Sequence, residues 1–182
     1  MVDEINFIEQ LQNAQTKEQA FRALVANYKE RLYWHIRKIV ISHDDADDVL
    51  QNTFIKIFKG IDKFKQESQL FSWMYRIATN ESISFINKRA KEKNLDISDY
   101  QYSLTSNLDS DHNFDGDAIQ LILQKAIQTL PAKQQLVFNM KYFDELKYKE
   151  ISEILETSEG ALKASYFHAV KKIENYIKNN TH

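Results

Sequence analysis

The sequence predicts an all-α protein built from two small helical domains. Only three Gly and one Pro occur among 182 residues, which leaves little of the turn chemistry that β-rich folds need. Apolar residues recur at intervals of three and four in several segments, which is the helical period. A polar, acidic segment without this period separates two helical blocks, so we expect domains at residues 1–93 and 118–182 and a flexible linker at residues 94–117.

Charge and composition narrow the class of protein further. The net charge of −2 is unevenly spread: residues 94–117 hold six Asp and no Lys or Arg, while residues 21–93 hold fourteen Lys or Arg against nine Asp or Glu. Nucleic-acid binding depends on such local excess rather than on the sum. The absence of Cys excludes disulfides and thiolate metal sites. No signal-peptide pattern and no apolar run of membrane-span length occur, so we expect a cytoplasmic protein without membrane insertion.

Residues 44–59 predict the first strongly amphipathic helix. Asp residues open it, where they favour the positive end of the helix dipole, and Gly60 follows it as a stop signal. The apolar positions share one side, namely Val49, Leu50, Phe54, Ile57 and Phe58. The polar side carries Asp48, Gln51 and Asn52, which either face solvent or contact a protein partner.

Residues 70–89 predict a second helix after a polar loop. Met74, Ile77, Ala78 and Phe85 can face a core. Aromatic, amide and cationic residues alternate over the rest of this helix, namely Trp73, Tyr75, Arg76, Asn80, Asn87, Lys88 and Arg89. That mixture suits single-stranded DNA, because aromatic rings stack on bases for about 1–3 kcal/mol each and cations follow phosphates. An aromatic stripe at helical spacing also fits a core, so this segment alone leaves both interpretations open.

The second domain begins with two expected helices, residues 118–129 and 132–143, with Pro131 placed for the first turn of the latter. Residues 147–177 then predict two helices joined by a tight turn. Ile151, Ile154 and Leu155 form one apolar stripe. The next residues, 156–158, break the pattern, and Ser158 is suited to cap the last helix.

The last helix has two distinct faces. Leu162, Tyr166, Ala169 and Ile173 are spaced four, three and four apart and should face a core. The opposite face carries Gly160, Lys163, Ala164, Phe167, His168 and Lys171. Small residues near the helix start allow close approach and cations suit phosphates, as in a recognition helix in a DNA major groove. A helical hairpin with a solvated basic face is the plainer alternative.

Taken together, these motifs resemble the extracytoplasmic-function group of sigma factors, initiation subunits of bacterial RNA polymerase of the sigma-seventy type. The resemblance covers about residues 20–178. Its first part is DADDVLQNTFIKIFK, followed by FSWMYRIATN and NKR. Its second part is LPAKQQLVFNMKYFDELKYKEISEILETSEGALKASYFHAV. It implies that the first domain is region two, which binds the polymerase clamp and opens the −10 element. It implies that the second domain is region four, whose helix-turn-helix reads the −35 element as a duplex.

The resemblance also assigns residues. Asp48, Gln51 and Asn52 correspond to the clamp-binding helix. The −10 reading and melting helix holds Trp73, Arg76, Asn80, Asn87 and Lys88. The −35 reading segment spans Lys163 to Lys171. It is part of the face of the last helix that begins at Gly160. Core RNA polymerase, promoter DNA and an anti-sigma factor are the implied partners, and neither a cofactor, a metal nor catalysis is expected.

Four positions depart from the family pattern. Glu156 stands where the turn commonly has Gly, so the turn geometry is expected to differ slightly. Ser165 and His168 replace arginines, so guanine and phosphate contacts of those arginines do not carry over. Ser84 stands where Asp is frequent. These changes concern the promoter sequence and not the class.

Two other classes of function are compatible with parts of the sequence. A stand-alone helix-turn-helix transcriptional regulator would use the second domain alone and leave Trp73, Arg76 and Asn80 without a role. An enzyme of the metal phosphohydrolase kind would use His43-Asp44 with further His ligands. The other histidines are few and scattered, at positions 35, 112, 168 and 182, so we interpret residues 43–45 as a loop and helix cap.

Overall fold

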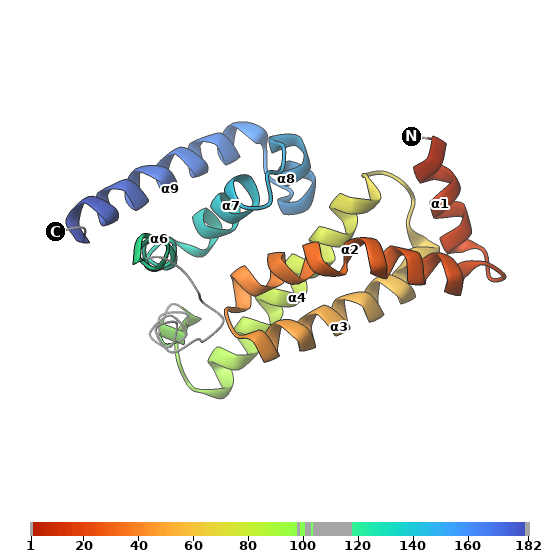
Figure 1. Cartoon of the computed structure of the whole chain (residues 1–182), viewed down its shortest axis with the longest axis horizontal. Helices are drawn as coiled ribbons and strands as arrows, with labels where there is room; N and C mark the ends of the chain where they lie inside the picture. Colours follow the sequence, from red (N-terminus) through yellow and green to blue (C-terminus); the bar gives the residue numbers. More distant parts are fainter. Residues whose placement is uncertain (1, 98, 101–102, 104–117, 181–182) are drawn as a thin grey trace. The chain divides into compact units, whose positions relative to one another are not determined.

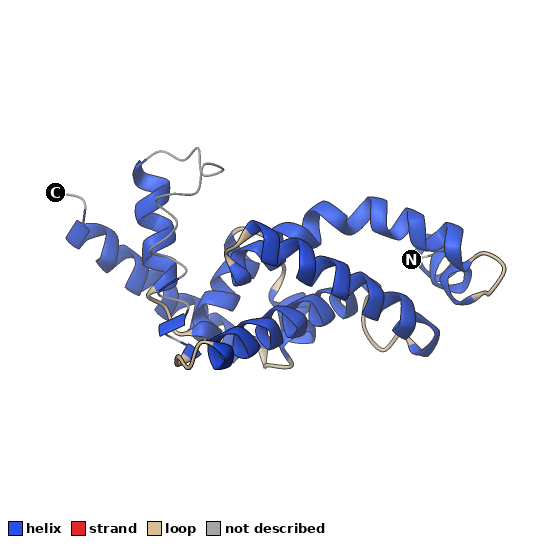
Figure 2. Cartoon of the chain, turned by 90° about the horizontal axis from the view of Figure 1, so that it is seen from below, coloured by secondary structure: helices blue, strands red, loops and turns tan. Residues whose placement is uncertain are grey.

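The computed structural model describes residues 2–97, 99–100, 103 and 118–180. Its elements are α1 (Val2–Gln12), α2 (Lys17–Val40), α3 (His43–Gly60), the 3₁₀ turn η1 (Ile61–Lys63), α4 (Leu70–Glu92), α6 (Ala118–Gln128), α7 (Ala132–Tyr142), α8 (Tyr148–Leu155) and α9 (Glu159–Asn180) (Figure 1). No strand occurs in these ranges, which confirms the all-α class (Figure 2). None of the described helices combines the length and the apolarity that a membrane span requires.

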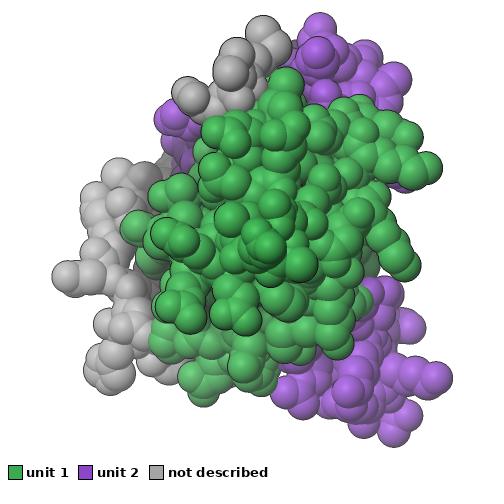
Figure 3. Space-filling view, turned by 90° about the vertical axis from the view of Figure 1, so that its right-hand side faces the viewer, with its two compact units in different colours: residues 1–83 green, residues 84–182 purple. Residues whose placement is uncertain are grey.

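The chain divides into two compact units, residues 1–83 and residues 84–182 (Figure 3). The division falls inside α4, so the first part of this helix belongs to the first unit and its end to the second. The functional boundaries expected at residues 93 and 118 stay a prediction.

In the first unit, α2 and α3 lie side by side and antiparallel, and both α1 and α3 contact η1 (Figure 1). The buried core draws on α2, α3 and α4, with Leu24, Leu32, Ile36, Val49, Ile57 and Met74 almost entirely removed from solvent. Burying each such side chain stabilises the fold by roughly 1.5–3 kcal/mol relative to leaving it exposed. The apolar faces predicted for residues 44–59 and 70–89 therefore supply the core that positions the polar faces of the same helices, except that Phe58, placed on the apolar side by the sequence, is 37 % exposed.

In the second unit, α9 packs against α6, α7 and α8. The core there consists of Ala126, Ile127, Leu130, Phe138, Ala169 and Ile173. Leu162 is buried as well, and Tyr166 packs against the cluster, so the core face predicted for the last helix is confirmed. Pro131 differs slightly from expectation, because it caps α7 in an extended conformation instead of lying in the first turn.

The start of the predicted linker contains one buried residue among exposed ones, since residues 94–97 and Asp99 are exposed. Asn94 ends α4 in the left-handed conformation, φ 53°, and Tyr100 is only 2 % exposed with Lys93 Nζ 5.1 Å from the centre of its ring. Most of the predicted linker lies outside the described residues, so its flexibility stays a prediction.

Candidate nucleic-acid interface

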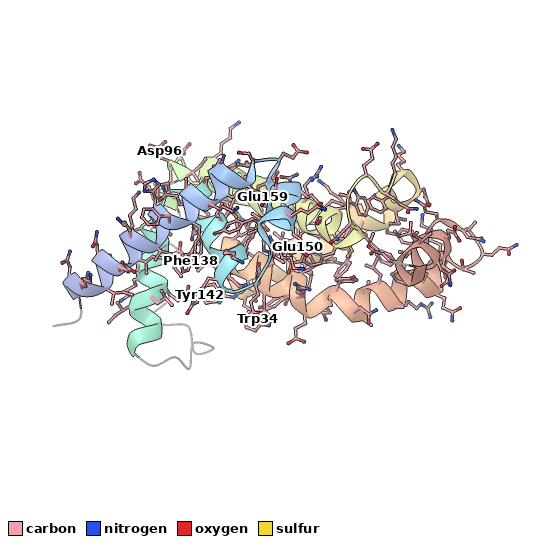
Figure 4. The ribbon with its side chains drawn as sticks, turned by 90° about the horizontal axis from the view of Figure 1, so that it is seen from above. Trp34, Asp96, Phe138, Tyr142, Glu150 and Glu159 are labelled. Carbon is pink, nitrogen blue, oxygen red and sulfur yellow. The ribbon has the colours of Figure 1, made fainter. Side chains whose placement is uncertain are left out.

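The helix-turn-helix motif of the second unit is formed by α8, a three-residue turn and α9. Lys147 precedes α8, and its N–H donates to the carboxylate of Glu150 at 2.7 Å, which satisfies one free donor at the helix start. Ser158 caps α9, since its hydroxyl accepts from the N–H of Ala161 at 3.4 Å, as the sequence predicts. Glu150 and Glu159 mark these two helix starts in Figure 4.

The turn between the two helices adopts the conformation that glycine favours although it contains none. Glu156 has φ 51° and ψ 42°, and its N–H donates to the carbonyl of Ser152. This left-handed conformation costs an L-residue roughly 1 kcal/mol. The turn therefore uses the left-handed conformation at Glu156, and its difference from a turn that carries Gly stays a prediction.

All six residues of the proposed −35 face on α9 are exposed, namely Gly160, Lys163, Ala164, Phe167, His168 and Lys171. A Cβ built on Gly160 would meet nothing within 4 Å, so the first turn of this face is open. Lys171 Nζ lies 4.6 Å from the centre of the Phe167 ring. The face thus presents a small, open start followed by an aromatic ring and a cation, and its role in DNA binding stays a prediction.

A basic cluster beside this face was missed at the sequence level. Tyr148, the first residue of α8, has Lys141 Nζ 5.2 Å and Lys163 Nζ 5.6 Å from the centre of its ring. Lys147 and Lys149 are the neighbours of Tyr148 in the chain. Burial, and then the neighbouring Tyr166, raises the pKa of Tyr148 above its ordinary value, at which the hydroxyl is already protonated at neutral pH. Lys141 comes from α7 and Lys163 from α9, and no spacing rule within one helix reveals such a cluster.

The start of α4 forms a pocket with the preceding loop. Its volume is about 480 Å³, and it is lined by Lys63, Phe64, Lys65, Glu67, Ser68, Trp73 and Arg76. Trp73 is half-buried and packs on the Phe64 ring, with ring centres 5.0 Å apart. A Cβ at Gly60 would lie only 3.3 Å from the Trp73 ring, so the absence of a side chain there makes room for the indole. The structure therefore brings Trp73 and Arg76 together as predicted and adds a loop that the sequence did not single out.

The remaining candidates on α4 fall in different places. Asn80 is exposed on the next turn of the helix and does not line the pocket. Asn87 and Lys88 are also exposed, but they lie on the part of α4 that belongs to the second unit. The position of Tyr75 differs from the sequence interpretation, which grouped it with the residues suited to single-stranded DNA. Tyr75 is fully buried against His35 and Phe71, so it cannot stack on a base.

The polar side of α3 forms a second exposed surface. Asp48, Gln51 and Asn52 are all exposed, and they lie within two turns of each other. Ile55, one turn further along, is 43 % exposed and places an apolar side chain on the same stretch. Ile55 was not expected at this surface, since it is an apolar residue at the helical spacing of the polar side.

The residues considered for a metal site have structural partners. His43 is the first residue of α3, and its Nδ1 is hydrogen-bonded to the Tyr33 hydroxyl. The cap of this helix is Ser42, whose hydroxyl accepts from the N–H of Asp45 at 3.4 Å, so residues 43–45 form the first turn instead of a loop. Among the described residues, no group of three or more His, Asp or Glu side chains is arranged to hold a metal ion.

The chain matches two protein-family models and several characterised sigma factors. Residues 24–92 match the family Sigma-70 region 2, and residues 120–173 match Sigma-70, region 4. The SigW ECF RNA polymerase sigma factor of Bacillus subtilis is 31% identical over 154 residues, covering 80% of this chain and 82% of its own. The ECF RNA polymerase sigma-E factor of Haemophilus influenzae is 27% identical over 182 residues, covering 94% and 93%.

Two solved structures share the fold at 20% sequence identity. CnrH, solved in complex with the cytosolic domain of CnrY, superposes with a TM-score of 0.70 over 99% of both chains. The sigma factor RpoE of Bartonella quintana, solved in complex with the anti-sigma factor NepR, superposes with a TM-score of 0.67 over 88% of this chain and 98% of its own. At this identity the likeness concerns the fold alone.

Proposed function

This chain belongs to the extracytoplasmic-function RNA polymerase sigma factors of the sigma-70 family, and on that premise we propose how its surfaces divide the work of promoter-directed initiation. The exposed side of α3 at Asp48, Gln51 and Asn52 binds the clamp of core polymerase. The exposed face of α9 binds the −35 element as duplex DNA. The pocket at the start of α4 captures a base of the −10 strand.

The pocket beside Trp73 and Arg76 is the observation that carries this proposal. Its volume lies within the roughly 300–1,000 Å³ that small-molecule sites in proteins occupy, which is ample for one nucleobase. Trp73 offers an aromatic wall, and Lys63, Lys65 and Arg76 bring three positive charges to the same opening against the one negative charge of Glu67. Extruding a base costs a few kcal/mol, which stacking and phosphate contacts of this kind offset. A stand-alone regulator of duplex DNA has no use for such a pocket, and the region-two match disfavours it.

The remaining features of the function follow from this assignment. The protein carries out no covalent chemistry itself and supplies sequence specificity to polymerase, so it works in the cytoplasm, where the polymerase is. The sigma factor RpoE of Bartonella quintana was solved with the anti-sigma factor NepR, and we propose that a protein of this class also restrains this chain.

Reconstitution tests the proposal directly. The purified chain is mixed with bacterial core polymerase, and transcripts are mapped from duplex templates drawn from a genomic library. We expect initiation at a discrete set of promoters with related −10 and −35 elements only when the chain is present. Sequence-specific binding of duplex DNA by the chain alone, without any polymerase-dependent initiation, would support a stand-alone regulator instead.

A further inference from the structure

The exposed face of α9 is apolar along its centre line. Gly160, Ala164 and Phe167 follow one another at i, i+4 and i+7, so they lie in one row along the helix. Phe167 is 54 % exposed, its ring contacts the neighbouring His168 ring and the Lys171 ammonium, and it lies outside the core cluster of the second unit. Over about two turns this row offers no side-chain hydrogen-bonding group, and His168, four residues after Ala164, stands beside Phe167 on the same exposed face.

The Lys side chains of this face lie beside the row of Gly160, Ala164 and Phe167 or further along the helix. Lys163 Nζ lies 3.9 Å from the Glu159 carboxylate and near the Tyr148 ring, which draws it towards α8. Lys171 follows one turn after Phe167 with its ammonium above the ring. No Arg occurs between residues 160 and 182, so the bidentate reading of guanine by a guanidinium is absent from this helix.

We propose that Phe167, together with Ala164, reads the 5-methyl group of thymine in the major groove of the −35 duplex. The inference rests on the proposed function, in which α9 enters that groove. Thymine is the base that presents a methyl group there, and apolar side chains are the groups that recognise it. Gly160 lets the helix start approach closely enough for the ring to reach the base edge, while Lys163 and Lys171 hold the phosphates on either side.

The test separates the methyl group from every other feature of the base pair. Holoenzyme formed with core polymerase selects −35 sequences from a randomised duplex library. Each thymine of the selected element is then replaced singly by uracil, which keeps the pairing and loses only the methyl. We expect about a fourfold loss of affinity at one or two thymines, the factor that burying one methyl group is worth.

The variant Phe167→Ala makes the assignment specific to one residue. It should bind the thymine and uracil duplexes equally, since the ring that distinguishes them is gone. Lys171→Ala is the matched control, because it should weaken both duplexes by the same factor and keep their ratio. An element selected without thymine, equal binding of thymine and uracil by the unmodified chain, or an unchanged ratio in Phe167→Ala would each overturn the inference. Failure of the holoenzyme to select any sequence would instead contradict the proposed function.

Discussion

The imidazole Nε2 of His35 lies 2.9 Å from the hydroxyl of Thr79 in the interior of the first unit. The Thr79 hydroxyl donates to the carbonyl of Tyr75 at 2.8 Å, so it accepts from His35, and the histidine carries its proton on Nε2. Both side chains are at most 1 % exposed. This bond joins α2 to the segment of α4 that holds Trp73 and Arg76, so it fixes how that segment presents the pocket.

Loss of this hydrogen bond should destabilise the first unit measurably. Thr79→Val removes the acceptor of a buried N–H, which we expect to cost about 1–3 kcal/mol in the free energy of unfolding. Urea denaturation followed by tryptophan fluorescence measures it, because both tryptophans, Trp34 and Trp73, lie in the first unit. The double variant with His35→Leu should cost less than the two single changes together.

The matched control is the exposed histidine of the same unit. His43→Leu should cost less than Thr79→Val, because the hydrogen bond of His43 to Tyr33 is exposed to solvent and leaves no buried group unpaired when it is lost. Strict additivity of His35→Leu and Thr79→Val would show that the two side chains act independently.

Glycine at the turn of the helix-turn-helix motif should stabilise the second unit. Glu156→Gly removes the strain of a left-handed L-residue, and we expect a gain of up to about 1 kcal/mol after the greater entropy of the unfolded glycine is counted. Glu156→Val should lower stability, because a β-branched side chain tolerates this conformation poorly. Hydrogen exchange of the buried amides of α9 reports both changes. Slower exchange in Glu156→Val than in Glu156→Gly would contradict the account.

Helical periodicity predicted the parts of the fold that depend on one helix at a time. The spacing of Leu162, Ala169 and Ile173 identified buried positions, because a helix brings residues three and four apart to one face. Tyr75 was assigned wrongly because a sequence does not say which of several aromatic residues on one helix faces the core. The pocket escaped prediction because Lys63 and Phe64 approach Trp73 and Arg76 across a turn without any period.

A larger side chain at position 160, at the start of α9, should weaken DNA binding without lowering the stability of the fold. Gly160→Leu meets no neighbouring atom at its Cβ and replaces a poor helix former, so stability should be unchanged or up to about 1 kcal/mol higher. Affinity of the holoenzyme for the −35 duplex should fall at least tenfold, because the side chain fills the space needed for close approach. Asn175→Leu, exposed further along α9, is the control and should leave DNA binding unchanged. Equal affinity of both variants would remove Gly160 from the interface.

Charge reversal on α3 should prevent assembly with polymerase. Asp48→Lys combined with Gln51→Lys places two cations on the exposed side of the helix without touching its buried side. We expect loss of binding to core polymerase in a pull-down assay, with a circular dichroism spectrum that stays helical. The control combines Gln19→Lys with Glu30→Lys, which makes the same change of charge at exposed positions of α2. This variant should still bind core polymerase. Retention of wild-type affinity by the α3 variant would exclude this surface as the clamp contact.

Substitutions of Trp73 and Asn80 should impair opening of the −10 element much more than they impair promoter binding. Trp73 lines the pocket and Asn80 lies exposed on the same helix, whereas the proposed clamp and −35 surfaces lie elsewhere and still hold duplex promoter. Trp73→Ala and Asn80→Ala should therefore keep promoter affinity to within a few fold but lose permanganate-reactive thymines near −10, since the contacts that offset unstacking are missing. A template with a pre-melted bubble should restore transcription. Trp34→Ala removes the other tryptophan of the unit, which is 53 % exposed and outside the pocket, and should open the promoter normally. Normal opening by both Trp73→Ala and Asn80→Ala would show that the pocket captures no base, and Trp73 would then serve only to pack against Phe64.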